Sequence, residues 1–326
     1  MDRIASASRK ERNAIFLETS KIKKISAAMV EKDFWVTWTL GKIFEDEFLK
    51  KSLCFKGGTS LSKVFHLIER FSEDIDLILD WRRITSEDVF KESNTKQALF
   101  NEQLGKQSHK FIATELKSRI QKKVSPICEV SVDADDENCL NVIYPKSIGD
   151  DYIKPYIKLE IGPLAAWDPN DIFPIASYVA EANKELGLKD VFVPAIKAER
   201  TFWEKATILH REHFRPETTN TPIRYSRHYY DLYKMASSPV KNSAFSRLDL
   251  LRTVVHFKDV FYHCKWAKYE LATQGNFKLI PSDSNLAILK NDYKSMRSMI
   301  FGDYPSWDCI IDSLGTLETE INKLKI

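Results

Sequence analysis

Residues 53–79 read LCFKGGTSLSKVFHLIERFSEDIDLIL, and this stretch decides the fold. It begins with a run typical of a strand, continues through the adjacent pair Gly57 and Gly58, and then shows apolar residues at helical spacing up to Ile68. The apolar run IDLIL that follows is again typical of a strand. The stretch therefore predicts a strand, a glycine turn, a helix that begins at Thr59 or Ser60, and a second strand.

Two carboxylates occupy alternate positions of the second expected strand. Side chains at i and i+2 of a strand point to the same face, so Asp74 and Asp76 are expected to project together while Ile75 and Leu77 enter the core. A divalent cation relieves the repulsion between adjacent carboxylates, and Mg²⁺ prefers a few carboxylates supplemented by phosphate oxygens of a substrate. The pattern predicts metal ligands at a nucleoside triphosphate site. The alternative is an ordinary buried strand with two solvated acids.

The glycine pair supplies the other half of such a site. Without a Cβ, two glycines let the backbone approach phosphate groups closely, and a helix that starts just after them directs free N–H groups at an anion. The chain has only 10 glycines in 326 residues, which gives the pair more weight. The segment is not a Walker A loop, because no glycine directly precedes its lysine. The candidate nucleotide-binding residues are Gly57, Gly58, Thr59, Ser60 and Lys63.

The flanking sequence predicts an α+β protein in two parts. One helix is expected over 25–48 and one or two amphipathic helices over 86–124, whereas ICEVSV, CLNVIYP and YIKLEIG, between residues 127 and 162, are typical of strands. From Pro194 onward the pattern is mainly helical. We therefore expect a domain over 1–190 with a small mixed sheet, and a helical domain over 191–326.

Composition argues against several classes of protein. Hydrophobic residues make up 43% of the chain and charged residues 29%, which is ordinary globular usage and argues against a disordered chain or a coiled coil. No apolar run reaches the roughly 18 residues of a membrane helix, and the start, MDRIASASRKERN, lacks the apolar core of a signal peptide. A cytoplasmic protein without a membrane partner is expected. The net charge of +3 does not by itself identify a nucleic-acid binder.

The central block resembles a known family. Gly-Gly-Thr-Ser at 57–60, then a helix, then Arg-Phe-Ser-Glu-Asp-Ile-Asp-Leu at 70–77 is similar to the signature of the AbiEii/AbiGii-type nucleotidyltransferase toxins, a MenT-like group of the DNA polymerase β-like superfamily. Val-Glu-Lys-Asp at 30–33 and Arg-His-Tyr-Tyr-Asp-Leu-Tyr at 227–233 also resemble that family. The resemblance covers residues 26–235. It implies a bilobed protein in which a helical lobe completes the active-site cleft of a nucleotidyltransferase lobe.

The resemblance also implies roles for residues of the first lobe. Asp74 and Asp76 would hold Mg²⁺, with Mn²⁺ as an alternative ion, and so position a nucleoside triphosphate (NTP) for attack at its α-phosphate by an acceptor hydroxyl. Ser72 would contact the nucleotide. Members of the superfamily often use a third acid on a neighbouring strand, and Glu160 of YIKLEIG is the candidate metal ligand. An edge-strand acid paired with Lys158 is the alternative.

Two residues of the helical part match further motifs of the family. Lys205 matches the lysine of the third motif and lies at the edge of the apolar arc of its helix, where its ammonium would stabilise phosphate charge. A solvated surface lysine is the alternative. Asp231 matches the fourth motif and would position either Lys205 or the acceptor. The simpler interpretation of Asp231 is an exposed ion pair with Arg227, one helical turn earlier.

The acceptor implied by the resemblance is RNA, in particular the 3′ end of tRNA, and a cognate antitoxin would restrain the enzyme in a toxin–antitoxin or phage-defence system. Basic clusters would form an RNA-binding surface if they converge, although charge runs are usually solvated faces. These clusters are Lys21, Lys23 and Lys24; residues 117–123; and Arg211, Arg215, Arg224 and Arg227. The alternatives are transfer to a protein or small-molecule hydroxyl, and a non-catalytic nucleotide-binding module.

Overall fold

The computed structural model describes residues 1–72, 74–149, 153–164 and 166–325. The chain forms two compact units that exchange segments along the sequence. The first unit comprises Met1–Val64, Phe71–Val89 and Leu99–Ile196. The second comprises Phe65–Arg70, Phe90–Ala98 and Lys197–Ile326. The chain thus passes into the second unit for the last time after Ile196, close to the expected boundary at residue 190. Two short earlier segments, Phe65–Arg70 and Phe90–Ala98, also belong to the second unit, and a single boundary does not describe them.

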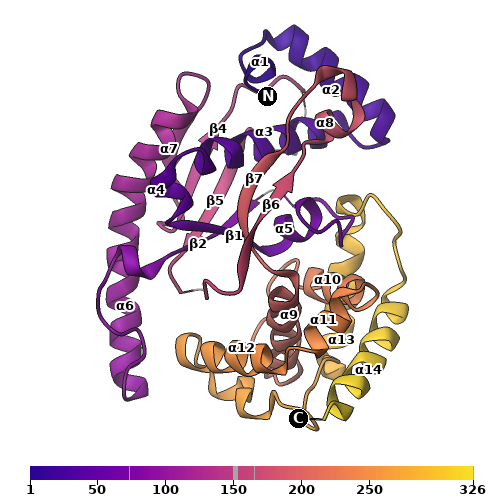
Figure 1. Ribbon diagram of the computed structural model, residues 1–326. Helices are drawn as coiled ribbons and strands as arrows, with labels where there is room; N and C mark the ends of the chain where they lie inside the picture. The colour runs from indigo at the N-terminus through magenta and orange to yellow at the C-terminus, as the bar shows by residue number, and fades with distance from the viewer. Residues whose placement is uncertain (73, 150–152, 165, 326) are drawn as a thin grey trace. The chain divides into compact units, whose positions relative to one another are not determined.

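The first unit is built on a mixed seven-stranded sheet (Figure 1). Its strands, in spatial order, are β3 (Glu129–Val132), β4 (Cys139–Ile143), β5 (Tyr156–Gly162), β2 (Asp74–Leu79), β1 (Leu53–Lys56), β7 (Val191–Ile196) and β6 (Asn170–Ile175). β2 pairs in parallel with β5, and β1 in parallel with β7, whereas the other neighbours are antiparallel. The mixed sheet and its first five strands in chain order are confirmed.

Helices of the first unit pack on the sheet and on one another. They are α1 (Asp2–Ala5), α2 (Arg9–Lys23), α3 (Ala27–Phe44), α4 (Glu47–Lys50), α5 (Gly57–Lys63), α7 (Lys117–Val124) and α8 (Tyr178–Ala182), with the short turns η1 (Trp81–Arg83) and η3 (Lys184–Leu186). α3 lies across the strands, and its buried Phe34 and Trp35 share one core with Phe55, Leu77 and Leu159 of the sheet. The opposite side chains of β2, including Asp74 and Asp76, are turned away from that core.

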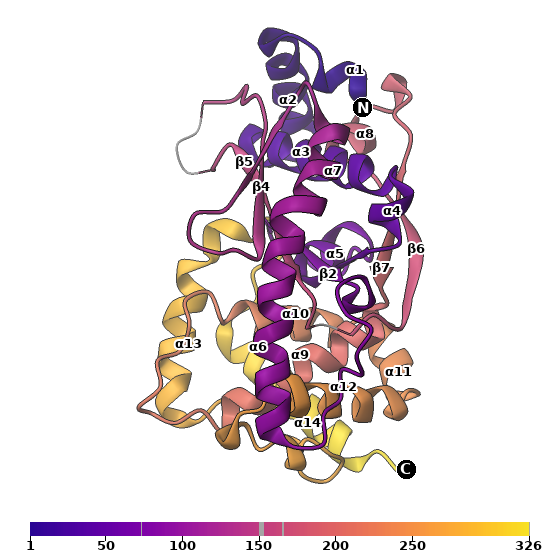
Figure 2. The ribbon, with the colours of Figure 1, turned by 90° about the vertical axis from the view of Figure 1, so that its left-hand side faces the viewer.

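A long, continuous helical segment precedes β3. α6 (Asn94–Phe111), a π-helical turn (Ile112–Leu116) and α7 follow one another without a break (Figure 2). This confirms the amphipathic helices expected over 86–124. The expected single helix over 25–48 is wrong in one respect: Asp46 accepts hydrogen bonds from the backbone N–H groups of Phe48 and Leu49 and so begins a separate helix, α4.

Two further expectations about local structure are wrong. The helix after the glycine pair begins at Gly57 and ends at Lys63, because the chain leaves the first unit after Val64 and His66 adopts a left-handed backbone conformation with φ of 52°. Pro194 does not open a helix; it lies inside strand β7, and the following helix begins at Ala198. Strand β6 was not expected at all.

The second unit is helical, as expected. Its helices are α9 (Ala198–His213), α10 (Arg227–Ala236), α11 (Val240–Phe245), α12 (Leu248–Phe261), α13 (Asp283–Ser295) and α14 (Trp307–Lys323), with short turns η4 (Lys265–Ala267), η5 (Tyr269–Leu271) and η6 (Arg297–Met299). α9 contacts α10, α11 and α12, and its Phe202 and Trp203 are completely buried. No described helix of either unit is long and apolar enough to span a bilayer.

Candidate active site

Strand β2 presents the two expected carboxylates on one face. Asp74 and Asp76 are half-buried, whereas Ile75 and Leu77 between and after them are completely buried. The parallel register with β5 places Glu160 directly beside Asp76. β5 lies between β2 and β4, so Glu160 is not on an edge strand. Lys158, the alternative partner of Glu160, has its ammonium 3.9 Å from Asp133. The alternation inferred from the sequence is therefore confirmed.

Gly57 forms a tight elbow against the Asp76 carboxylate. Its φ is +80°, and a Cβ built at this position would lie 1.9 Å from Oδ2 and 3.0 Å from Cβ of Asp76. The backbone thus uses both properties of glycine here, the left-handed conformation and the missing side chain. Gly57 and the Asp76 carboxylate, which the sequence predicts to act together, are thus in direct contact within the first unit.

We expect Gly57→Ala to abolish nucleotidyl transfer while lowering the free energy of unfolding by about 1–3 kcal/mol, because the new methyl group displaces Asp76 and the backbone is strained. Urea denaturation and transfer assays measure the two effects separately. Gly105→Ala is the matched control: it lies inside α6 with nothing near its added Cβ, so we expect it to stabilise the fold by about 0.5–1 kcal/mol. Full activity of Gly57→Ala would contradict the tight packing.

The residues that follow the elbow hold it in place. The Thr59 hydroxyl donates to the backbone oxygen of Asp74 at 2.6 Å, and the Ser60 hydroxyl donates to the backbone oxygen of Gly57 at 2.9 Å. Both side chains are buried, as is Gly58. These bonds tie α5 to the start of β2. Ser72 is half-buried two residues before Asp74, and Glu73 lies outside the described residues. The nucleotide contacts expected of this segment remain predictions.

Lys63 is held inside the first unit. Its ammonium lies 2.6 Å from Oδ1 of Asp33 and 4.5 Å from the centre of the Tyr178 ring, and its side chain is 5% exposed. Asp33 also accepts the backbone N–H of Tyr178. Burial raises the pKa of Asp33, although the Lys63 charge acts in the opposite direction. The Val-Glu-Lys-Asp segment at 30–33 was noted in the sequence only for its resemblance to the family. Its Asp33 is the partner that anchors Lys63, the last residue of α5.

The second unit holds a buried charge cluster around Asp231. Arg70 donates from Nε to Oδ1 at 2.7 Å and from its terminal nitrogen to Oδ2 at 2.9 Å, which is a bidentate pair. The ammonium of Lys205 lies 2.9 Å from Oδ2 of Asp231 and 3.0 Å from Nδ1 of His228. All four side chains are buried. The expected contact between Asp231 and Lys205 is present, and the simpler pair with Arg227 is replaced by Arg70.

The charges of this cluster control its protonation. Burial alone would raise the pKa of Asp231, but Arg70 and Lys205 hold that pKa well below its usual range. Burial lowers the pKa of Lys205 against the attraction of Asp231. Burial and the neighbouring Lys205 and Arg227 charges lower the pKa of His228 well below its usual range. The neutral ring can therefore accept a hydrogen bond from the Lys205 ammonium at Nδ1. Arg70 and Lys205 therefore both bind the Asp231 carboxylate, which keeps it ionised in a buried site.

His228 should make the fold sensitive to mild acid. Because the pKa of His228 in the folded state is lowered below its unfolded value, stability is retained above pH 6.5 and falls as the pH drops further, with a slope of about 1.4 kcal/mol per pH unit. Urea denaturation between pH 7 and pH 5 measures it. His228→Gln should reduce this slope by the contribution of one bound proton. His263→Gln, at an exposed His–Asp pair, should leave the slope unchanged. Equal slopes in all three proteins would rule out a buried neutral His228.

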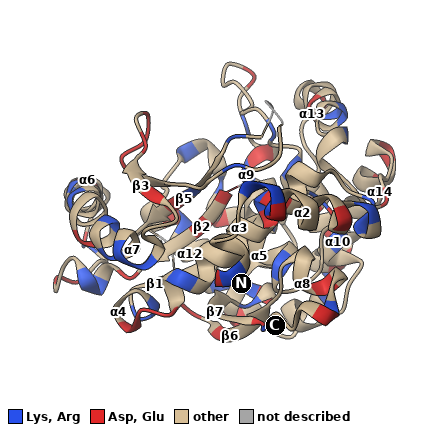
Figure 3. Ribbon diagram, turned by 90° about the horizontal axis from the view of Figure 1, so that it is seen from above, with Lys and Arg blue, Asp and Glu red and all other residues tan. Residues whose placement is uncertain are grey.

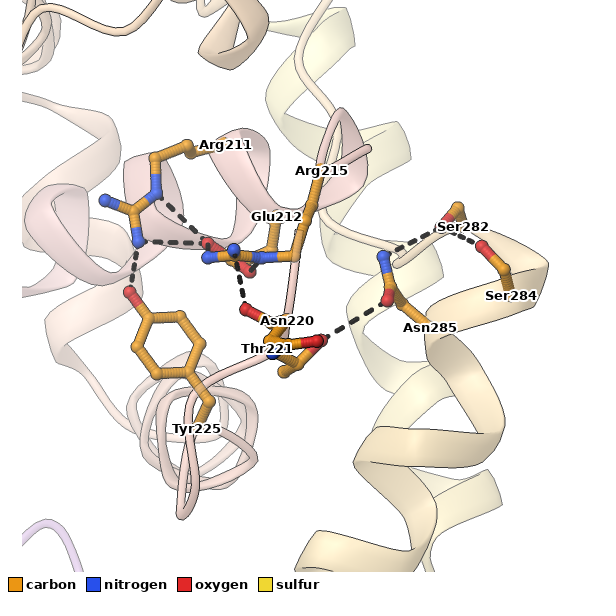
Figure 4. Close-up of polar contacts among 9 residues, drawn as sticks. All are labelled: Arg211, Glu212, Arg215, Asn220, Thr221, Tyr225, Ser282, Ser284 and Asn285. Atoms are coloured by element: carbon orange, nitrogen blue, oxygen red, sulfur yellow. Dashed lines mark hydrogen bonds and ion pairs between the residues drawn. The ribbon is translucent and has the colours of Figure 1, made fainter. Parts of the chain in front are cut away.

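Several members of the basic clusters noted in the sequence pair with acids of their own unit, and the RNA-binding surface expected of the clusters remains a prediction. Lys23 pairs with Glu181, and Arg119 pairs with Glu115 one turn earlier. Arg211 and Arg215 both bind Glu212, and Tyr225 contacts Arg211 (Figure 4). In Figure 3 acidic and basic segments are interspersed over the ribbon. Within the described ranges, no three or more His, Cys, Asp or Glu side chains converge on a point where they could hold a metal ion.

Comparison with known proteins assigns the family. The family model described as "Nucleotidyl transferase AbiEii toxin, Type IV TA system" matches residues 38–313. Among solved structures, the nucleotidyltransferase toxin MenT4 of Mycobacterium tuberculosis H37Rv is similar, with 14% identity and a TM-score of 0.47 over 95% of this chain and 97% of that chain. No curated protein matches the chain significantly. The matched range includes Gly57, Asp74, Asp76, Lys205 and Asp231. The chain belongs to the AbiEii family of nucleotidyltransferase toxins of type IV toxin–antitoxin systems, and it is a nucleotidyltransferase.

Proposed function

We propose that this enzyme transfers a nucleoside monophosphate from an NTP to the 3′ hydroxyl of an RNA, with tRNA as the acceptor, and that a cognate antitoxin restrains it. The observation that carries the proposal is the placement of Asp76 against Gly57, with Asp74 on the same face of β2. Phosphates can approach the backbone at a glycine elbow, and the adjacent carboxylates supply the oxygen donors that Mg²⁺ prefers beside a triphosphate.

Two carboxylates on one face of β2 are oxygen donors of the kind that Mg²⁺ prefers, although no third described acid converges with them. Asp74 and Asp76 would hold the ion, Glu160 beside Asp76 is the candidate for a further ligand, and substrate phosphate would supply other oxygens. A bound Mg²⁺ would neutralise charge on the α-phosphate and on the leaving pyrophosphate. The chain's own contribution is to orient the two carboxylates. Gly57 and the Thr59 bond to the Asp74 backbone fix their positions.

We propose that the charge cluster of the second unit acts on the same nucleotide. Lys205 would bind phosphate oxygens, and Asp231 would position Lys205 through their 2.9 Å contact. Support comes from the buried contact between these two side chains and from the family model, whose matched range includes both residues.

The test is to incubate the protein with total tRNA and each of the four α-labelled NTPs in separate reactions, with and without Mg²⁺. The proposal expects Mg²⁺-dependent label on tRNA, with pyrophosphate released, from at least one NTP. Label on polypeptide with RNA untouched would replace RNA by a protein acceptor. Binding of an NTP without transfer to RNA, protein or small-molecule hydroxyls would reduce the chain to a nucleotide-binding module.

A further inference from the structure

A basic pocket lies at the far end of the strand that carries the two carboxylates. It has a volume of about 490 Å³ and is lined by Lys51, Asp80, Arg82, Arg83 and Trp167, all of which belong to the first unit. Neither the family signature nor the candidate site described above includes these residues. The volume lies in the range typical of ligand sites.

Asp80 and Trp167 place one side of the pocket on the same face of the sheet as Asp76. The backbone N–H of Asp80 donates to the Ser52 oxygen at 2.9 Å, so the pairing of β2 with β1 continues to this residue. By alternation, Asp76, Ile78 and Asp80 share a face. Trp167 packs against the buried cluster formed by Ile78, Cys54 and Ile196, which lies on this face, and it lines the pocket together with Asp80. Four residues of strand place the pocket about 13 Å from Asp76.

The cations of the pocket are held in place by local contacts. The buried Asp80 accepts the backbone N–H of Arg82 at 3.1 Å and its Nε at 2.8 Å, and the Arg82 side chain is nevertheless 56% exposed. Arg83 donates to the backbone oxygen of Lys51 and lies over the ring of Phe48. The lining thus contains the cations Lys51, Arg82 and Arg83 and one acid, Asp80, with Asp168 acting on Arg82 from nearby. The lining side chains therefore carry a positive charge.

Side chains of this kind recognise single-stranded nucleic acid. Guanidinium groups bind phosphate oxygens through paired N–H donors, and a flat indole ring stacks on a base of any sequence. We propose that this pocket binds a nucleotide of the RNA acceptor a short distance inward from the 3′ end that receives the new nucleotide. The inference rests on the proposed function for the identity of the acceptor, because the reacting end must lie at Asp74 and Asp76.

The test compares Arg82→Gln/Arg83→Gln with the wild type. A short fluorescein-labelled single-stranded RNA, without NTP, reports affinity by anisotropy at several salt concentrations. We expect affinity to fall by about tenfold or more and the salt slope to fall by about 0.7 for each lost phosphate contact. Arg247→Gln is the matched control, because Arg247 also donates from Nε to an aspartate two residues away and its side chain is 45% exposed. It should bind RNA like the wild type.

Further measurements keep the two proposals separable. Trp167→Leu keeps an apolar side chain against the buried Ile78 cluster but removes the flat ring. It should weaken RNA binding without changing the midpoint of thermal unfolding by more than the control does. Binding of an α-labelled NTP should be unchanged in all variants.

The outcomes that would overturn the pocket assignment differ from those that would overturn the proposed function. If the double variant has the RNA affinity and the KM for RNA of the wild type, the pocket assignment is wrong even if the wild type labels RNA. If the wild type labels no RNA but the double variant loses oligonucleotide binding, the pocket stands and the proposed function fails. Loss of NTP binding alone would also overturn the assignment.

Discussion

Asp76→Asn is expected to reduce nucleotidyl transfer by about a thousandfold or more. The substitution keeps the shape of the side chain, so the contact with Gly57 and the pairing of β2 are preserved, but it removes a charge that a divalent cation needs. Metal-assisted stabilisation of charge at phosphate is worth several kcal/mol, and about 1.4 kcal/mol corresponds to a tenfold change in rate. Initial rates of label transfer from an α-labelled NTP measure the effect.

The control for this substitution is Asp135→Asn. Asp135 is an exposed aspartate of the same unit, in the turn between β3 and β4. It should leave the rate unchanged. Asp74→Asn should resemble Asp76→Asn, since both carboxylates share one face. Transfer at the wild-type rate in both β2 variants, with Mg²⁺ saturating, would show that the strand carboxylates are not the metal ligands.

Arg70→Ala is expected to lower the free energy of unfolding by about 3–5 kcal/mol. The substitution removes both bonds of the bidentate pair and leaves the completely buried Asp231 with Lys205 as its remaining charged partner. A buried charge that loses its partner costs far more than an exposed one, because water cannot replace the lost bonds. Urea denaturation monitored by tryptophan fluorescence gives the change directly. Arg70→Lys should fall between the wild type and Arg70→Ala, because it keeps the charge but not the two-bond geometry.

The matched comparison is Arg247→Ala. The Arg247–Asp249 pair has a similar geometry, with Nε of Arg247 3.0 Å from Oδ1, but both side chains are largely exposed. Exposed ion pairs contribute between zero and about 1 kcal/mol, so this variant should lose little stability. Equal losses in the two variants would show that the Asp231 cluster is solvated in solution.

The elements that could be predicted from the sequence are those specified by short-range patterns. Asp74 and Asp76 alternate with buried Ile75 and Leu77, so their shared face follows from the geometry of one strand. Gly57 likewise stands out because its neighbourhood needs a residue without a Cβ. In both cases the information lies within a few residues of the feature it specifies.

The errors arose where tertiary packing overrides local preference. Apolar residues between Leu61 and Ile68 have helical spacing, yet the chain must pass into the second unit after Val64, and the helix ends. Pro194 is typical of a helix start, but among the described residues β7 pairs with β1 only through Phe55 and Ala195, so a missing N–H is tolerated in this strand. Pro174 hid strand β6, which lies at the edge of the sheet where proline is accepted.

Long-range partners could not be predicted in the same way. Arg70 lies within the family block, but its partner Asp231 is 161 residues away, and no spacing rule connects them. Asp33 and Lys63 are separated by 30 residues and meet only when α3 and α5 have packed. In each case the charged residue is visible in the sequence, while the opposite charge that it needs is specified only by the fold.

The exchange of segments between the two units has a consequence for engineering this toxin. The chain crosses between the units five times, after Val64, Arg70, Val89, Ala98 and Ile196. A fragment made of the helices after Ile196 would therefore lack Arg70, and its buried Asp231 would lose the bidentate partner and keep only Lys205. Neither half can be cut away or transplanted as one continuous piece, so attempts to detoxify the protein by truncation would destroy the remaining half as well, and point substitutions are the appropriate tool.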